Sequence, residues 1–247
     1  MRNIKVNKLI IGVILSMLIL SGCSKERQVE KHFEEILSMY PTSNLEDWYE
    51  REGYRDDDFS PNDKGTWILR SSTSIPNGDK LISEGMVLKL NRNTKKATGY
   101  YFITDLFEDE KGFAQKKGRE YPVKMEKNKI ILTKEVNDVK LKTKIENFKF
   151  FSQYGKFKDL KEYGEGDITY NPNVPSYSAE YQLTNEDDNV KEIRKRFNIQ
   201  GKKAPELELK GTGDLKGSSV GYRTLQYKFK KNDDLLFVRD SVVYNPS

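Results

Sequence analysis

The sequence predicts an α+β fold in which antiparallel β-sheet predominates over a few short helices. Short segments that alternate apolar and polar residues recur along the chain, and turn-forming residues separate most of them. Only a few segments repeat apolar residues at helical spacing. The chain of 247 residues also holds 14 Tyr, 12 Phe and 2 Trp, which is enough large side chains for a core although 33% of the residues are charged.

The first 22 residues have the layout of an export signal. Residues 1–8 are basic, and residues 9–20 form an apolar run. As a helix this run rises about 18 Å, less than the roughly 30 Å of hydrocarbon in a bilayer. Leu20, Ser21, Gly22 and Cys23 follow, and they resemble the lipobox of bacterial lipoproteins. We therefore expect residues 1–22 to be a lipoprotein signal peptide.

Cys23 is the predicted lipidation site. Its thiol is the nucleophile that takes a diacylglyceryl group, and small residues before it give a peptidase access to the backbone. Cleavage leaves Cys23 as the N-terminus, N-palmitoylated and S-diacylglycerylated, and two acyl chains suffice for stable anchoring. Residues 23–30 are then a lipidated, charged tether at the extracellular face of the cell membrane. The alternative is an ordinary secretory signal with a chance cysteine.

The first half of the mature chain is expected to form two helices and a strand meander. Val29, Phe33 and Ile36 favour a helix over 28–39, and Asn44 can cap a second helix over 45–52. Alternation then predicts strands, and charged glycine-containing stretches predict loops. The strands are expected over 66–72, 81–91, 97–105, 121–125 and 129–133, and the loops over 55–65 and 108–120.

The second half follows a similar order. Residues 145–151 fit a strand or a helix, and 164–175 are expected to be an extended loop because Gly164, Gly166, Pro172 and Pro175 punctuate them. Val190, Ile193 and Phe197 predict a helix over 189–198. The remaining alternating segments are strands over 176–183, 206–210, 221–230 and 235–243.

The order of elements leaves two domain descriptions open. Residues 31–247 are expected to form a single α+β domain, with candidate subdomains over about 31–140 and 141–247. The halves could be similar helix-plus-sheet units, because Asn44–Leu45 lines up with Asn189–Val190 and 86–102 with 222–238. Two generic helix-plus-hairpin units explain that thin identity more simply.

Charge and residue inventory restrict the function. The export signal holds three basic residues, which leaves 40 basic and 38 acidic residues in the mature chain. A net charge of about +2 with mixed signs does not suggest a nucleic-acid partner. One cysteine allows no internal disulfide, and His32 alone argues against a catalytic triad or a zinc site. We expect no enzyme activity, no cofactor and no metal.

Four further features carry weaker alternatives. Asp56–Asp58 with Asp63 is acidic, but consecutive aspartates do not match the ligand spacing of a calcium loop. Residues 211–219 are glycine-rich without the ending of a phosphate loop. The aromatic and lysine-containing run 147–160 is interpreted as a core element rather than a contact with lipid headgroups or nucleic acid. A carboxylate pair for glycoside hydrolysis can be neither located nor dismissed.

Many short stretches, in order along the mature chain, resemble the staphylococcal tandem lipoproteins, a family of clustered paralogous surface lipoproteins. They are MYP (39–41), NLED (44–47), EGYRDD (52–57), DKGTW (63–67), GMVL (85–88), NRNT (91–94), GYY (99–101), YPVKM (121–125), IENFKFF (145–151), YNPNVPSYSA (170–179), YQLTN (181–185) and LKGSSVGY (215–222). The resemblance implies host-cell contact and uptake and stimulation of innate lipoprotein receptors. It implies no catalytic residue.

We therefore expect a membrane-anchored, non-enzymatic interaction module at the host interface. Its partners would be the membrane, through Cys23, and a host surface protein or innate lipoprotein receptor. The second hypothesis is a lipoprotein that binds a small ligand or cell-wall fragment, which a deep apolar pocket would favour. The third is an envelope hydrolase, which a close carboxylate pair in a cleft would favour.

Overall fold

Antiparallel strands dominate the structure, a computed structural model. It describes residues 25–55, 59–60, 62–109, 111–215, 222–231 and 234–246. A helix occupies residues 25–37. The other helical elements are η1 (Leu45–Tyr49), α2 (Val139–Glu146), η2 (Phe151–Gln153), η3 (Leu160–Tyr163) and α3 (Asp188–Phe197). The strands are β1 (Thr66–Asn77), β2 (Lys80–Asn91), β3 (Lys96–Glu108), β4 (Ala114–Glu126), β5 (Lys129–Leu132), β6 (Asp167–Asn171), β7 (Ser176–Gln182), β8 (Glu206–Thr212), β9 (Arg223–Lys231) and β10 (Asp234–Asn245).

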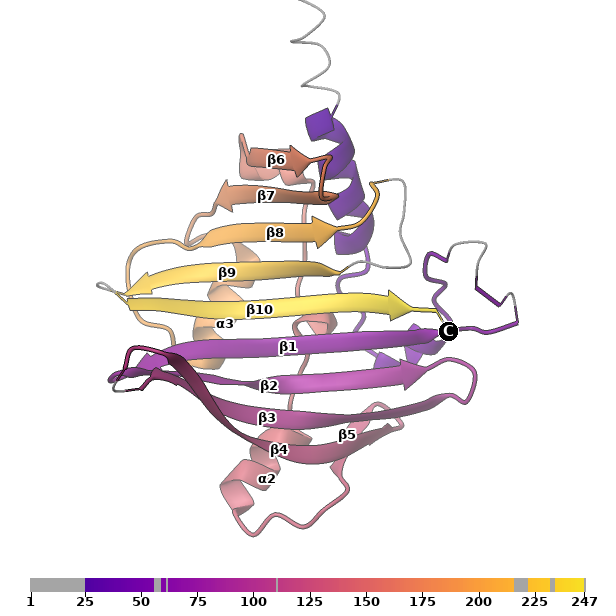
Figure 1. The fold of residues 1–247 in the computed structure, drawn as a ribbon, viewed down its shortest axis with the longest axis vertical. Coiled ribbons are helices and arrows are strands. Elements are labelled where there is room, and N and C mark those ends of the chain that lie inside the picture. The colour runs from indigo at the N-terminus through magenta and orange to yellow at the C-terminus, as the bar shows by residue number, and fades with distance from the viewer. Residues whose placement is uncertain are drawn as a thin grey trace, which may run out of the picture.

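All of these strands join one antiparallel sheet in the order β5-β4-β3-β2-β1-β10-β9-β8-β7-β6 (Figure 1). Each half of the chain contributes a meander of neighbouring strands. The two meanders meet where β1 pairs with β10, from Thr66 opposite Asn245 to Ser74 opposite Phe237. The predicted α+β class with predominant antiparallel sheet is confirmed, and the sheet runs without a break from one half of the chain to the other.

The two faces of the sheet differ in what covers them. On β1, Trp67, Leu69, Ser71 and Thr73 are buried, whereas Arg70 between them is exposed. The buried set faces a single core that also takes side chains from the helical segments, and in Figure 1 α3 is seen behind β10. We call this side the covered face and the side that carries Arg70 the open face. This is the pattern of an antiparallel sheet with one packed and one solvated side.

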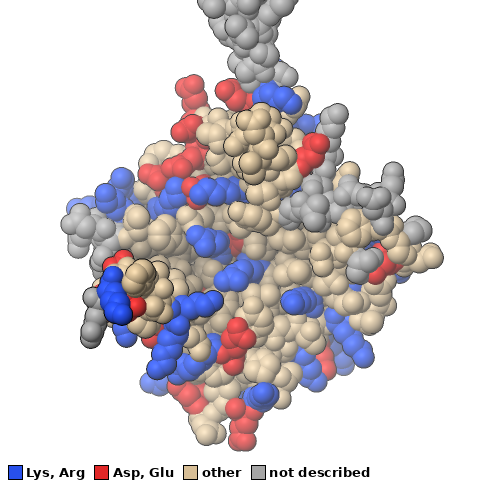
Figure 2. All heavy atoms as spheres, in the orientation of Figure 1, with Lys and Arg blue, Asp and Glu red and all other residues tan. Residues whose placement is uncertain are grey.

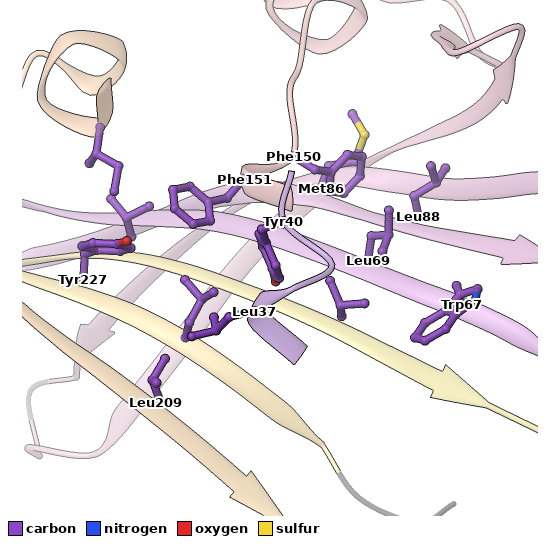
Figure 3. Close-up of a cluster of buried hydrophobic side chains, with 14 of the residues drawn as sticks. Leu37, Tyr40, Trp67, Leu69, Met86, Leu88, Phe150, Phe151, Leu209 and Tyr227 are labelled. Carbon is purple, nitrogen blue, oxygen red and sulfur yellow. The ribbon is translucent and has the colours of Figure 1, made fainter. Parts of the chain in front are cut away.

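The core of the covered face is rich in aromatic rings. Figure 3 shows Tyr40, Phe151 and Tyr227 among aliphatic side chains from several strands. The ring centroids of Phe151 and Tyr227 are 5.5 Å apart, and those of Tyr40 and Phe151 are 6.0 Å apart. Such tilted and edge-on pairs stabilise a core beyond simple area burial. They join η2, β9 and the segment after the first helix.

The first helix begins earlier than expected. The predicted helix over 28–39 is observed over 25–37, with Val29, Phe33 and Leu37 buried along one side. Residues 25–30, expected to be a tether, are therefore helical. The sequence did not predict this helical turn, because Val29 is the only apolar residue among residues 25–30. Val29 is fully buried, so the turn is amphipathic.

Three further segments differ from the expectation. Residues 114–120, expected to be loop, begin β4, and residues 167–171, also expected to be loop, form β6. Residues 114–120 show no alternating pattern, because every side chain among them is exposed. Residues 167–171 do alternate, but they form a short edge strand, and the glycines and prolines around them favoured a loop. α2 was not expected, and residues 145–151 complete its end and continue as irregular chain to η2. Asp138 caps α2 by accepting from two backbone N–H groups.

The predicted helix at 45–52 is a shorter 3₁₀ helix, η1, with Asn44 as its cap as expected. A helical segment followed by three meandering strands occurs twice, as η1 with β1 to β3 and as α3 with β8 to β10. The two helices differ in type and length. An internal duplication stays a prediction.

Candidate functional site

A pocket of about 230 Å³ lies on the covered face, where α2 and α3 approach β1 to β3. Ser71 and Thr73 of β1, Glu84 of β2 and Tyr101 of β3 line one side. Aromatic and basic side chains from the helical layer line the other, namely Lys144, Phe148, Phe151, Tyr154, Arg196 and Phe197. The pocket thus combines aromatic walls with a few polar groups that point inward.

The polar groups of this pocket are already paired with one another. The Glu84 carboxylate accepts hydrogen bonds from Lys144 Nζ at 2.5 Å and from Tyr101 Oη at 3.1 Å. Burial and the charge of Glu84 raise the pKa of the Tyr101 hydroxyl, so it stays protonated and donates. At the rim, Arg196 stacks 4.0 Å from the Tyr154 ring centroid. A ligand would have to compete with these contacts.

The size of the pocket does not favour a drug-sized ligand, because such pockets usually hold about 300–1,000 Å³. A wider hollow of about 600 Å³ lies beside it, near the start of α3. Most of the residues that line it are polar or charged types, with Lys156, Asp188, Lys191 and Lys195 among them. The two hollows share Tyr154. Both hollows are open to the surface, and charged side chains line part of each.

A buried carboxylate lies beneath the first pocket. Asp240 of β10 is 1% exposed and accepts hydrogen bonds from Tyr40 Oη at 2.6 Å and from Ser71 Oγ. Ser71 Oγ in turn accepts from the Phe151 backbone N–H at 2.8 Å. Burial raises the pKa of Asp240 to about 7, although the hydrogen bonds from Ser71 and Tyr40 lower it. This network joins β1, β10, η2 and the segment after the first helix.

The alternating pattern of β10 could have predicted that Asp240 is buried. In β10 the side chains of Val238, Asp240, Val242 and Tyr244 alternate toward the core, and all four are buried. An acidic residue at a core-facing position of an alternating strand indicates a buried polar network, because an unpaired carboxylate there would be very unfavourable.

His32, the single histidine of the chain, lies in the first helix and has structural contacts. It is 7% exposed, and its Nε2 accepts a hydrogen bond from Arg223 Nε at 2.9 Å. Its ring lies edge-on to Tyr177, with centroids 5.2 Å apart. Burial and the positive charge of Arg223 lower the pKa of His32 to about 4. The imidazole is therefore neutral at physiological pH and acts as an acceptor.

Asp56–Asp58, most of the acidic cluster, lie outside the described residues. Asp63 is described, and its carboxylate accepts from the Gly65 backbone N–H at 2.6 Å and from Asn93 Nδ2 at 2.8 Å. This role is that of a loop residue. Over the residues that the structure describes, no group of three or more His, Cys, Asp or Glu side chains could hold a metal ion.

A close pair of carboxyl groups, Glu34 and Asp159, is present among the described residues. Burial and the neighbouring charge of Asp159 raise the pKa of Glu34. Asp159 also caps η3 by accepting from the Lys161 backbone N–H. Neither residue lines the two hollows beside α3. The pair lies apart from both of these hollows.

The other two sequence features are structural where the structure describes them. Gly211 lies in β8 against the Tyr177 ring, where a Cβ atom would approach a ring carbon to 2.3 Å. It is a packing glycine, and residues 216–219 of the same run lie outside the described residues. Phe150 and Phe151 of the run 147–160 are fully buried, as a core element requires.

The open face carries a connected set of polar contacts. Lys228 Nζ of β9 bonds Glu180 of β7 at 3.1 Å and Glu208 of β8 at 2.9 Å. Arg239 of β10 donates to Gln226, which itself donates to Glu208 at 3.2 Å. These contacts form a ladder across four strands. Figure 2 shows this face, with basic side chains through its middle.

On β1 and β3, to one side of the ladder, the open face carries aromatic side chains and an arginine. The guanidinium of Arg70 stacks 4.8 Å from the Phe102 ring centroid, and Tyr100 and Phe102 lie on the same side of β3. Arginine and aromatic side chains are the residue types that dominate binding energy at protein interfaces. Sequence patterning could not find this surface, because alternation reports which residues share a face and not which face stays uncovered.

Cys23, the predicted lipidation site, lies outside the described residues. The family comparison bears on it indirectly. The model of the Csa1 family matches residues 25–247, so this chain belongs to the Csa1 family.

The relatives of this chain are bacterial lipoproteins. Two proteins of Staphylococcus aureus strain N315, both named uncharacterized lipoproteins, are 54% and 52% identical to it over 250 residues, which is 98% of each chain. An uncharacterized lipoprotein of strain USA300 is 53% identical over the same share. The resemblance to clustered paralogous staphylococcal lipoproteins is confirmed, and the chain is a membrane-anchored lipoprotein. No helix among the described residues is long and apolar enough to cross a membrane.

Proposed function

We propose that this protein is a non-enzymatic binding module, held at the extracellular face of the cell membrane by lipid on Cys23, that uses its open face to contact a host surface protein. The observation that carries the proposal is the uncovered side of a ten-stranded sheet. In the described chain the helical segments contribute their buried side chains to the core on the other side. The proposal also includes recognition of the lipidated N-terminus by innate lipoprotein receptors.

The chemistry of the open face supports a protein partner. Arg70, Tyr100 and Arg239 are accessible there. Arg239 belongs to the ladder of polar contacts across β7 to β10, and Arg70 and Tyr100 lie to one side of that ladder. An interface of this kind combines aromatic and arginine anchors with a polar rim. The mixed signs of the ladder also argue against a nucleic-acid partner, which would need a basic surface.

A binding experiment tests the interaction. Mature protein, with and without its lipid, is immobilised and exposed to solubilised host-cell surface proteins, and it is also tested for adhesion to intact cells. We expect both forms to retain a host surface protein through the folded domain, and only the lipidated form to stimulate lipoprotein receptors. If neither form bound any host surface, the proposal would be wrong.

The anchor has its own test. Cys23→Ala should abolish acylation, which mass spectrometry of the membrane fraction measures, and should leave uncleaved or shed protein. Ser24→Ala is the matched control, because it changes the neighbouring residue and leaves the thiol in place. Lipid retained by the Cys23→Ala protein would contradict the assignment.

The small-ligand hypothesis is the second candidate, and the aromatic walls of the 230 Å³ pocket favour it. Mass spectrometry of protein purified from its own cells, under non-denaturing conditions, would detect a co-purified ligand. A ligand lost on Tyr101→Ala but kept on Arg70→Ala would move the function from the open face to this pocket.

A further inference from the structure

The helix that starts the described chain lies very near the predicted lipid anchor. The chain is already helical at Lys25, the first described residue, and a single residue separates Lys25 from Cys23 in the sequence. Two residue spacings reach at most about 7 Å even when fully extended. The interfacial layer on each side of a bilayer is about 5–8 Å thick. Side chains next to Lys25 are therefore held at the headgroup layer.

The β6–β7 hairpin lies beside this point. Lys25 Nζ lies 5.4 Å from the ring centroid of Tyr170 at the end of β6, and Glu30 of the same helix accepts from Tyr181 Oη of β7 at 3.3 Å. In Figure 1 this hairpin and the helix share one end of the molecule, and α2 lies at the opposite end. The β6–β7 hairpin therefore lies at the end of the domain nearest the predicted lipid anchor.

The composition of the hairpin is unusual for this chain. Residues 168–179 include no charged side chain, although 33% of all residues are charged. The turn of the hairpin contains Pro172, Val174 and Pro175, and Val174 is 68% exposed. Figure 2 shows an uncharged knob near the top of the view, where Figure 1 places β6 and β7. An exposed valine beside a tyrosine suits a membrane interface, where aromatic side chains are enriched.

We propose that the β6–β7 turn contacts the lipid headgroup layer and fixes the orientation of the domain on the membrane. The inference rests on the proposed lipid anchor at Cys23 and goes beyond it, because a lipid alone would leave the domain free to rotate. The strands then run along the membrane surface and the open face stands upright beside it, accessible from the side (Figure 1).

A site-specific probe tests this orientation. Lipidation occupies the only native thiol, so Val174→Cys supplies the one free thiol of the mature lipoprotein. The variant is labelled with an environment-sensitive fluorophore and reconstituted in vesicles of phosphatidylcholine and phosphatidylglycerol. We expect the emission to shift to the blue and to be quenched by a lipid that carries a quencher near its headgroup.

Val139→Cys is the matched control, because Val139 is 74% exposed at the start of α2 at the other end of the molecule. Its label should report water. If the protein floats with the vesicles but both labels show the same water-like emission, the proposed membrane contact of the turn is wrong and the lipid anchor still stands. Protein that failed to float would overturn the lipid anchor itself. A Val174→Cys label already shielded in lipid-free protein would show that another protein surface covers the turn, and would also contradict the inference.

Discussion

The covered and open faces of the sheet are formed by the same strands but differ in burial and in the side chains they present. On the covered face, aromatic and aliphatic side chains from every part of the described chain join one core, and Asp240 is buried within it. On the open face, Lys228, Glu180 and Glu208 pair in partial contact with solvent. Full burial of a large apolar side chain contributes about 1.5–3 kcal/mol, and an exposed ion pair about 0–1 kcal/mol. Stability therefore resides mainly on one face, which leaves the other free to diverge for binding.

The largest expected difference between the faces comes from aromatic truncation. Phe151→Ala should lower the free energy of unfolding by about 3–5 kcal/mol, because it leaves a cavity among fully buried rings. Tyr100→Ala on the open face should cost less than about 1.5 kcal/mol, since Tyr100 is only half-buried. Chemical denaturation of both variants measures the contrast. Equal losses would contradict the division of stability between the faces.

A second difference concerns pH. The folded pKa of Asp240 is about 7, above the ordinary value of 3.8, so the folded state holds this proton more tightly than the unfolded state. Its contribution is greatest at low pH and is lost as pH rises from about 4 to about 7. The folded pKa of His32 is about 4, below its ordinary 6.5, so its contribution is lost as pH falls over nearly the same range.

The two groups therefore oppose each other in the native protein. In the Asp240→Asn variant only the His32 contribution to the pH dependence remains. The free energy of unfolding of that variant should therefore rise between about pH 4 and pH 6.5. His32→Gln should show the reverse slope, a fall in stability over that range. Denaturation curves collected across the range measure both slopes. Parallel pH profiles for the two variants would show that these groups do not govern the pH dependence.

The smallest expected effect is on the open-face ladder. Lys228→Ala removes contacts with Glu180 and Glu208, and we expect a loss below about 1 kcal/mol that shrinks further in high salt. Thermal unfolding at low and high ionic strength checks this. A loss as large as that of Phe151→Ala, unchanged by salt, would mean that the ladder is a structural element.

The sequence predicted those parts of the fold in which one face is buried. β7 alternates buried and partly exposed residues, and α3 places Val190 and Ile193 on one side, so both elements were found. The start of β4 was missed because backbone pairing alone holds residues 114–120, whose side chains are all exposed. Local patterns could not predict that β1 would pair with β10, because that contact joins residues far apart in the chain.

The same limit applies to the site. Cys23 could be predicted because a local motif specifies its chemistry. The pocket, the Asp240 network and the open face could not, because each is assembled from segments that only the fold brings together. Tyr40, Ser71 and Asp240 belong to three separate segments, and their hydrogen bonds follow from the pairing of β1 with β10.

The most direct test of the account is a binding comparison between two matched double variants. Arg70→Ala with Tyr100→Ala alters the open face, and Val139→Ala with Lys140→Ala alters an exposed part of α2 by the same kinds of change. We expect the open-face variant to bind host-cell surfaces at least about tenfold more weakly, equivalent to about 1.4 kcal/mol, while both variants keep their native circular dichroism spectrum. The α2 variant should bind as the native protein does. Unchanged binding by the open-face variant, or an equal loss by the α2 variant, would contradict the claim that the open face is the functional surface.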